Sequence, residues 1–309
     1  IRTNAFSLIW MGILLLAASN AMAVTYTVNA GESIQAAIDM AGATDIILVG
    51  DGIFNQNVNI NKAVTLVSMN GAGATTIQGS AAQATALAGN LGTLCLSVDG
   101  ITIGTGAADG FTIIGYDWTS PGIEHAAIYI KNSVHGDISI IGNSIVADGE
   151  AALLAEYGCI TGGNVEVASN EFSGQTYVGT TVGGTSADQY TIPNVPRSMV
   201  YFGGNNIGIS FHDNELGGSV GAIIEGTGDS YYNTGATIDC NGATDLATGA
   251  QIINNIITIP SWAALRARGG FSTVTDNDFD TSVSGEFVGA YYQNYETGIF
   301  ANNQRYMVP

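Results

Sequence analysis

Short stretches in which every second residue is apolar recur along the chain. Residues 24–28 read Val-Thr-Tyr-Thr-Val, and residues 57–61 read Asn-Val-Asn-Ile-Asn. A period of two predicts β-strands that bury one face. Residues 46–49 are apolar throughout, as in strands that are covered on both faces of a parallel sheet. The pattern therefore predicts many short strands.

One early segment has the period of a helix instead. The apolar residues of 34–41 are spaced three and four residues apart, which places them on one face of a helix. Ser33 is suited to cap its start, and Gly42 to end it. Only short strands and turns are predicted after it, so the chain does not alternate strands and helices as βαβ proteins do.

A six-residue pattern with a central asparagine, apolar-x-x-Asn-x-apolar, repeats along the rest of the chain. It occupies residues 140–145, 167–172, 211–216, 252–257 and 274–279, and an incomplete copy begins at 300. The asparagines are 143, 170, 214, 255, 277 and 303, so they are 27, 44, 41, 22 and 26 residues apart. Multiples of a unit of roughly 20 to 27 residues are typical of solenoids, in which each coil stacks on the next. We expect each asparagine to take the left-handed conformation at a bend and to hydrogen-bond along the stack.

The region from residue 24 to 79 resembles a known family. The similarity lies in Gly-Glu-Ser-Ile-Gln-Ala-Ala-Ile at 31–38, in the apolar strand 46–49, and in 58–62 and 64–66. These residues resemble the opening of right-handed parallel β-helix repeat proteins of the pectate-lyase-like superfamily, and the asparagine units resemble that superfamily's coils. The resemblance implies an all-β solenoid whose short N-terminal helix, 33–41, caps the first coil. It implies little about function, because this fold serves lyases, hydrolases, esterases, epimerases and adhesive surfaces.

The first 23 residues read as a secretory signal peptide. Arg2 is followed by an apolar run over 6–18 and by the small-residue cleavage pattern Ala21-Met22-Ala23. The run is shorter than the about 20 residues that cross a bilayer, although a retained membrane anchor is the alternative. We therefore expect a β-helix domain over 24–309 that is secreted or held at the cell surface, without a membrane span once the signal is removed. The last residues, 306–309, form no obvious closing cap, which leaves open that the domain continues.

Charge narrows the choice of partners. The chain has 26 acidic and 7 basic residues and a formal net charge of -19, which repels nucleic acid and anionic lipid. Cations or glycans fit better, although acidity also serves solubility alone. Three distant cysteines, Cys95, Cys159 and Cys240, match no metal motif. We expect them to be small buried residues; one disulfide after export stays open, with no pair selected.

The main candidate for chemistry lies near the C-terminal end. Arg266 and Arg268 alternate in a strand-like segment directly after Trp262. In lyases of the superfamily that the sequence resembles, an Arg or Lys removes a proton beside a uronate carboxylate, and aspartates hold calcium. The resemblance thus implies Arg266 or Arg268 as the base, with Asp276 and Asp278 assisting. Asp276, Asp278 and Asp280 would supply the hard oxygen ligands that calcium requires. The alternative is that the arginines balance surface acids and the aspartates flank the bend at Asn277.

Two weaker candidates follow. His212, Asp213 and Glu215 place carboxyl groups near one another, as glycoside hydrolysis requires, but polar residues are also expected at a bend. The other histidines, His125 and His135, are isolated, which argues against a site of several histidines. Tyrosines could stack on sugar rings or simply pack. They are Tyr291 and Tyr292, with Tyr231, Tyr232 and Tyr295, and Trp262 is a substrate-binding candidate of the same kind.

The sequence therefore predicts an exported β-helix that presents a binding face to polysaccharide or cell-surface glycan without catalysis. The alternative is a lyase or epimerase that acts on acidic polysaccharide with calcium assistance. The stretches 80–90 and 173–197 are expected to project as loops, which often carry binding. The oligomeric state does not follow from the sequence.

Overall fold

The computed structural model describes most of the chain from residue 22 onward. The described residues are 22–86, 91–116, 126–131, 133–149, 151–155, 164–176, 199–202, 208–218, 236–241, 251–258, 263–268, 273–279, 290–293, 299–301 and 304–305. They contain two short helices, α1 (Ile34–Met40) and α2 (Ala81–Ala86), and otherwise only strands. None of their helices is long and apolar enough to cross a bilayer.

The strands form three parallel sheets. Sheet A contains β1 (Thr25–Val28), β2 (Ile46–Val49), β5 (Thr65–Ser68), β8 (Ile101–Ile103), β11 (Ile138–Ile141), β14 (Val165–Ala168), β17 (Ile209–His212), β20 (Gln251–Ile253), β23 (Thr273–Thr275) and β26 (Ile299–Ala301). Sheet B contains β3 (Gly52–Asn55), β6 (Thr75–Gln78), β9 (Thr112–Ile114), β12 (Ser144–Gly149), β15 (Glu171–Thr176), β18 (Glu215–Leu216), β21 (Ile256–Ile257), β24 (Asp278–Phe279) and β27 (Gln304–Arg305). Sheet C contains β4 (Val58–Ile60), β7 (Gly92–Leu96), β10 (Ala126–Ile130), β13 (Ala151–Ala155), β16 (Val200–Phe202), β19 (Ala236–Asn241), β22 (Ala263–Arg268) and β25 (Ala290–Gln293).

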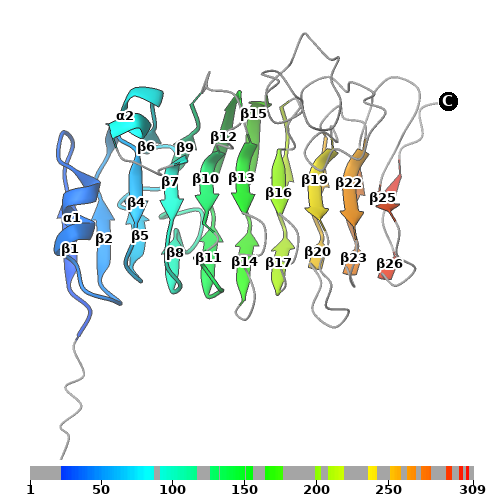
Figure 1. Cartoon of the computed structure of the whole chain (residues 1–309), viewed down its shortest axis with the longest axis horizontal. Coiled ribbons are helices and arrows are strands. Elements are labelled where there is room, and N and C mark those ends of the chain that lie inside the picture. Colours follow the sequence, from blue (N-terminus) through cyan, green and yellow to red (C-terminus); the bar gives the residue numbers. More distant parts are fainter. Residues whose placement is uncertain are drawn as a thin grey trace, which may run out of the picture.

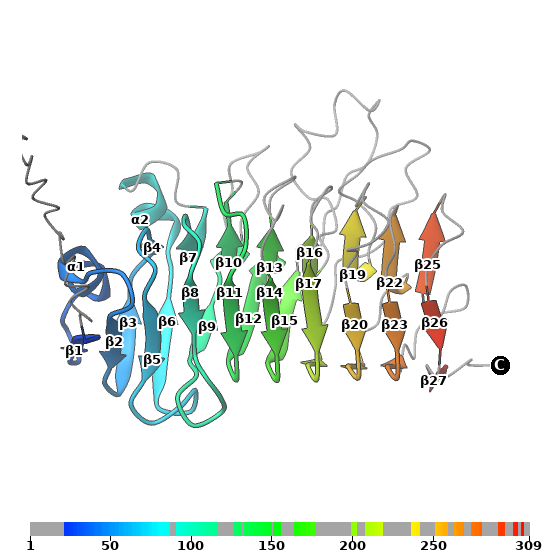
Figure 2. The ribbon, with the colours of Figure 1, turned by 90° about the horizontal axis from the view of Figure 1, so that it is seen from below.

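Each coil gives one strand to each sheet in the order A, B, C, and the next coil stacks on it (Figure 1, Figure 2). A strand of two to six residues cannot bury a face alone. Stacking solves this, because the inward residues of successive coils form one core cluster that runs from Val28 to Val274. The predicted all-β parallel β-helix is confirmed.

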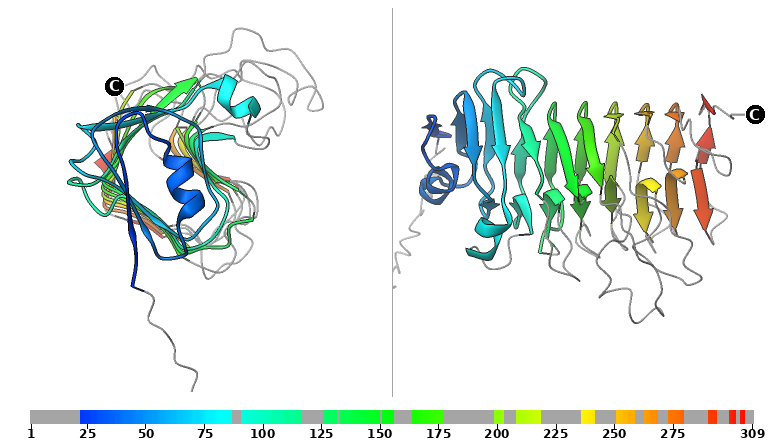
Figure 3. Two further views of the ribbon diagram at one scale, coloured as in Figure 1. Left: turned by 90° about the vertical axis from the view of Figure 1, so that its left-hand side faces the viewer. Right: turned by 90° about the horizontal axis from the view of Figure 1, so that it is seen from above.

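The helix α1 lies across the open end of the first coil (Figure 3). Ile34, Ala37 and Ile38 of α1 are buried and belong to the same core cluster. The Ser33 side chain accepts a hydrogen bond from the Ala36 amide at the start of α1. At its end the Lys62 ammonium donates to the carbonyl oxygens of Asp39 and Ala41, at 2.6 Å each. These contacts shield the N-terminal edge of the core from water.

The repeated asparagines are buried, and they form a hydrogen-bonded ladder between coils. Each asparagine is one rung of this ladder, and its side-chain oxygen accepts from the backbone amide of the asparagine in the preceding coil. For example, the Asn143 amide donates to Asn170 Oδ1 at 2.9 Å. The expected bonding along the stack is therefore confirmed for the five described rungs, which are Asn143, Asn170, Asn214, Asn255 and Asn277. At the first rung the oxygen of Asn143 accepts from the Phe111 amide.

The expected conformation of these asparagines was wrong. The left-handed residue is the one before each asparagine, with φ between 54° and 72°. These residues are Gly142, Ser169, Asp213, Asn254 and Asp276. The reason is geometric: the bend turns the next side chain inward, where only a side chain that both donates and accepts can satisfy the carbonyl and amide groups at the corner.

The prediction of a projecting loop over residues 80–90 was partly wrong. Residues 81–86 form α2 rather than an irregular loop. The Gln83 carboxamide fastens this helix to the first coils, because it accepts from the Asn57 amide at 2.8 Å and donates to the Asn55 carbonyl at 2.7 Å. Of the second stretch, 173–176 belong to β15, and 177–197 lie outside the described residues.

Candidate functional site

The outer face of sheet C carries a column of residues from successive coils. In the first coils the inward positions, such as Leu94 and Ile128, belong to the main core. The alternate positions Cys95, Tyr129 and Leu154 lie in a separate buried cluster on the opposite side of the sheet. Cys95 is thus a small buried residue, as the sequence predicted. Cys159 lies outside the described residues.

The pairing between strands of sheet C shows which residues continue this outer column in the C-terminal coils. Leu154 pairs with Tyr201, Tyr201 with Asp239, Asp239 with Arg266, and Arg266 with Tyr291. Partners in a parallel ladder lie about 4.8 Å apart. Arg266 therefore sits between a carboxylate-bearing and an aromatic residue on one face. Two residues further along the same strands, Arg268 sits between Asn241 and Gln293.

This register separates the predicted tyrosines. Tyr291 shares the face of Arg266. Tyr292 pairs with Ala267 and occupies the register position that Leu96, Ile130 and Ala155 hold in earlier coils, where those residues face the core. Trp262 and the tyrosines Tyr231, Tyr232 and Tyr295 lie outside the described residues.

The predicted calcium ligands lie elsewhere in the coil. Asp276 is exposed at the corner between sheets A and B and adopts φ 60°. Asp278 lies on β24 of sheet B, in register with Ile256 and Gln304, whereas Arg266 and Arg268 lie on sheet C. Asp280 is outside the described residues. In the part of the chain that is described, no group of three or more His, Cys, Asp or Glu could hold a metal ion. The calcium set stays a prediction.

Sequence reasoning missed Asp239, although one signal pointed to it. Asp239 precedes Arg266 by 27 residues, which is the spacing of a single coil between the first two repeated asparagines. The signal was hidden because the asparagines of these two coils, Asn214 and Asn255, are 41 residues apart rather than 27.

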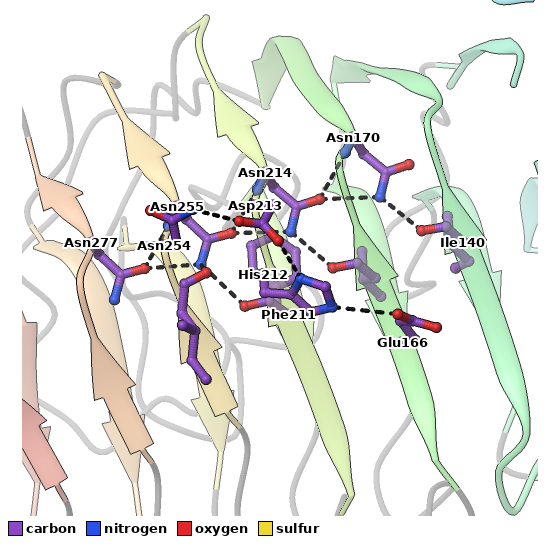
Figure 4. A network of polar contacts seen from close by, with 12 residues as sticks. Ile140, Glu166, Asn170, Phe211, His212, Asp213, Asn214, Asn254, Asn255 and Asn277 are labelled. Carbon is purple, nitrogen blue, oxygen red and sulfur yellow. Dashed lines mark hydrogen bonds and ion pairs between the residues drawn. The ribbon is translucent and has the colours of Figure 1, made fainter. Parts of the chain in front are cut away.

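A second polar network covers the outer face of sheet A at the ladder corner (Figure 4). His212 Nδ1 lies 2.7 Å from Asp213 Oδ2, and His212 Nε2 lies 3.4 Å from Glu166 Oε1 on β14. Asn254 Nδ2 donates to Asp213 Oδ1 at 2.5 Å. Both ring nitrogens thus face carboxylate oxygens. Glu215 lies on β18 of sheet B, in register with Glu171, and His135 is exposed. The network links β14, β17 and β20, which belong to three successive coils.

Acid should weaken this network. The hydrogen bond from His212, followed by that from Asn254, holds the pKa of Asp213 below its ordinary 3.8. A carboxyl whose pKa is lower in the folded than in the unfolded chain contributes stability above the unfolded pKa and loses it as the pH falls through the folded value. The melting temperature of the protein should therefore exceed that of Asp213→Asn at neutral pH and converge with it well below pH 3.8. An unchanged difference across this range, measured by circular dichroism, would contradict the assignment.

A cavity of about 360 Å³ opens near α1 and α2. Three of its lining side chains, Gln35, Gln56 and Gln83, use both carboxamide atoms in hydrogen bonds. Gln56, for example, accepts from the Ile34 amide at 2.9 Å and donates to the Glu32 carbonyl at 2.7 Å. These hydrogen bonds hold the two helices on the coils.

Comparison with known proteins identifies the fold. No protein-family model matches the sequence, and no curated protein matches it. Among solved structures, pectin methylesterase from Yersinia enterocolitica matches at 15% identity and a TM-score of 0.53, over 88% of this chain and 89% of that one. Pectin methylesterase PemA from Erwinia chrysanthemi matches at 12% identity and a TM-score of 0.54, over 91% and 92%. A pectin methylesterase in complex with a hexasaccharide matches at 11% identity and a TM-score of 0.51, over 88% of each chain. At these identities the likeness concerns architecture: the chain has the right-handed parallel β-helix fold of pectate-lyase-like proteins.

Proposed function

We propose that this chain is an exported protein that binds polysaccharide on the outer face of sheet C, at its C-terminal coils. The observation that carries the proposal is the register that aligns Asp239, Arg266 and Tyr291 across β19, β22 and β25. A guanidinium binds carboxylate and hydroxyl oxygens through several N–H donors, and an aromatic ring covers the C–H face of a sugar. Asn241 and Gln293, beside Arg268, add amide donors and acceptors.

The parallel coils suit a linear polymer. Coils repeat about every 4.8 Å along the solenoid, so a polysaccharide laid across the sheet would meet the same kind of position in each coil. Three solved structures with this fold are pectin methylesterases, one of them in complex with a hexasaccharide. Their names support a uronate-containing polymer as the first substrate class to test.

Net charge refines that class. A chain with a formal net charge of -19 repels a fully ionised polyuronate, and the repulsion is screened only beyond about 8 to 10 Å at ordinary salt. Two of the 7 basic residues stand in β22, where they would offset this repulsion locally. We expect stronger binding when the polymer is partly esterified, or when calcium bridges the carboxylates.

Catalysis is the second candidate. In the lyase alternative, Arg266 or Arg268 would remove a proton, with calcium at Asp276, Asp278 and Asp280. Arg266 stands in register with Asp239 and Tyr291, and Arg268 with Asn241 and Gln293.

The first experiment uses a chain that begins at Val24. Calorimetry measures its binding to a panel of polysaccharides, with and without calcium. The panel includes polygalacturonate of low and high methyl esterification, alginate and a neutral glucan. The double variant Arg266→Ala, Arg268→Ala should bind at least about tenfold more weakly, since charge-assisted hydrogen bonds are lost. The matched control Arg305→Ala removes a positive charge from sheet B and should change binding less than about twofold.

The same samples test for chemistry. Absorbance of unsaturated uronate products that rises with the protein and disappears in the double variant would establish the lyase alternative. Released methanol would establish an esterase. If folded, β-rich protein binds none of the polymers, or if the double variant binds as well as the protein, the proposed function is wrong.

A further inference from the structure

At the N-terminal edge of the solenoid the Asp45 carboxylate accepts two backbone hydrogen bonds. The backbone amide of Val24 donates to Asp45 Oδ1 at 2.8 Å, and the amide of Gly42 donates to Asp45 Oδ2 at 2.7 Å. Asp45 is only 8% exposed. Both carboxylate oxygens are therefore directed at backbone nitrogen atoms, and one of these belongs to the residue that follows the predicted cleavage pattern.

Within residues 22–28, Val24 is the first residue with a backbone hydrogen bond to the coils. The Val24 carbonyl accepts from the Ile46 amide at 2.9 Å, and from Thr25 onward the chain pairs with β2 in register. Met22, by contrast, is 87% exposed. Among the described residues, hydrogen bonding to the coils thus starts directly after Ala23.

We propose that hydrolysis of the Ala23–Val24 peptide bond creates an α-ammonium group at Val24 that forms an ion pair with the Asp45 carboxylate and locks β1 onto β2. In the cleavage, water adds to the Ala23 carbonyl carbon and the C–N bond breaks. Ala23 leaves as a carboxylate, and the Val24 nitrogen becomes a protonated amine. No other reactant is consumed, and a peptidase of the leader-processing class would catalyse the step.

The site is prepared for that positive charge. Before cleavage a neutral amide already holds the Val24 nitrogen at hydrogen-bonding distance from Asp45, so the charged donor needs no rearrangement. A charge-assisted hydrogen bond is roughly twice as strong as a neutral one. The remaining ammonium protons can reach water, because Val24 is 50% exposed.

The surroundings keep Asp45 ionised. The amides of Val24 and Gly42 hold the pKa of the Asp45 carboxyl below its usual range, and Lys62 adds a smaller attraction. The Lys62 ammonium itself donates to the carbonyl oxygens of Asp39 and Ala41 at the end of α1. The new terminus would thus join the contacts that close the N-terminal edge.

The experiment begins with the exported protein. N-terminal sequencing and intact mass should show a mature chain that begins at Val24; a different first residue would overturn the proposal. Two chains are then released from a fusion by a protease that leaves no extra residue, one beginning at Val24 and one at Ala21. Amide hydrogen exchange is followed over residues 25–28 and at Ile46, with β17 as an internal reference.

The chain that begins at Val24 should exchange these amides roughly fivefold more slowly than the chain that begins at Ala21, and β17 should exchange equally in both. In the Asp45→Asn background the difference between the two chains should disappear. Equal exchange in the two unsubstituted chains, or a difference that persists with Asp45→Asn, would overturn the ion pair. The comparison of the unsubstituted chains is decisive even where Asp45→Asn folds poorly.

Discussion

Replacement of Asn214 by alanine is expected to lower the free energy of unfolding by about 3 kcal/mol or more. Asn214 is 2% exposed and occupies the middle of the ladder. Its Oδ1 accepts from both the amide and the side-chain nitrogen of Asn170, and its Nδ2 donates to the Val167 carbonyl at 2.9 Å. In the alanine variant the Asn170 amide loses its acceptor, and Asn170 Nδ2 and the Val167 carbonyl each lose one hydrogen bond. A buried group left unsatisfied costs about 1 to 3 kcal/mol.

The matched control for this variant is Asn254→Gly. Asn254 is exposed at the same corner, with φ 54°, a conformation that glycine adopts without strain. The free energy of unfolding of this variant should lie within about 1 kcal/mol of the value for the unsubstituted protein, since only a surface contact to Asp213 is lost. Equilibrium urea unfolding followed by circular dichroism measures both variants. If the two lose similar stability, the buried ladder is not what secures the corner.

Replacement of Gly142 by alanine is expected to lower the free energy of unfolding by about 2 to 5 kcal/mol. The loss combines the strain of a left-handed backbone conformation with steric overpacking. Gly142 has φ 72°, and a Cβ placed there would lie 2.2 Å from the Gly106 carbonyl carbon and 2.4 Å from its oxygen. Both contacts are to backbone atoms, so no side-chain rotation can relieve them. The chain must move the 104–110 turn or lose the corner bend.

The equivalent corner one coil later provides the control. Ser169 has φ 55° and already carries a Cβ. The free energy of unfolding of Ser169→Ala should therefore lie within about 0.5 kcal/mol of the value for the unsubstituted protein. Thermal and urea unfolding of the two variants give the comparison. A Gly142→Ala protein as stable as Ser169→Ala would show that the 104–110 turn yields readily.

The contrast between these corners explains why the fold could be predicted and why part of it could not. The asparagine is repeated because every regular corner presents the same set of inward carbonyl and amide groups, so the pattern is visible in the sequence. The residue before it varies among Ser, Asp, Asn and Gly, because its side chain points to solvent unless a neighbouring turn covers it. The role of Gly142 depends on the 104–110 turn, which no local pattern connects to it.

The candidate site follows the same division. The strand-like alternation around Arg266 and Arg268 was predicted and is observed as β22. That Arg266 lies between Asp239 and Tyr291, and that Tyr292 takes a core-facing register position, depends on which residues pair between coils. The intervals between coils vary because insertions between strands differ in length, so sequence distance does not give the register.

The sequence by itself determined the strand type, the early helix, the repeating corner and hence the parallel β-helix, because these depend on hydrophobic period and on hydrogen bonds that every coil makes. It also identified Arg266, Arg268 and Tyr291 as candidates by residue type. Only the tertiary structure decided which residues stand in one column on sheet C and that the predicted aspartates 276 and 278 lie away from that sheet. It also decided that the two ring nitrogens of His212 face carboxylates from two coils. The physical reason is that a solenoid fixes neighbours through hydrogen-bond register between coils, and that register is a long-range property of the folded chain.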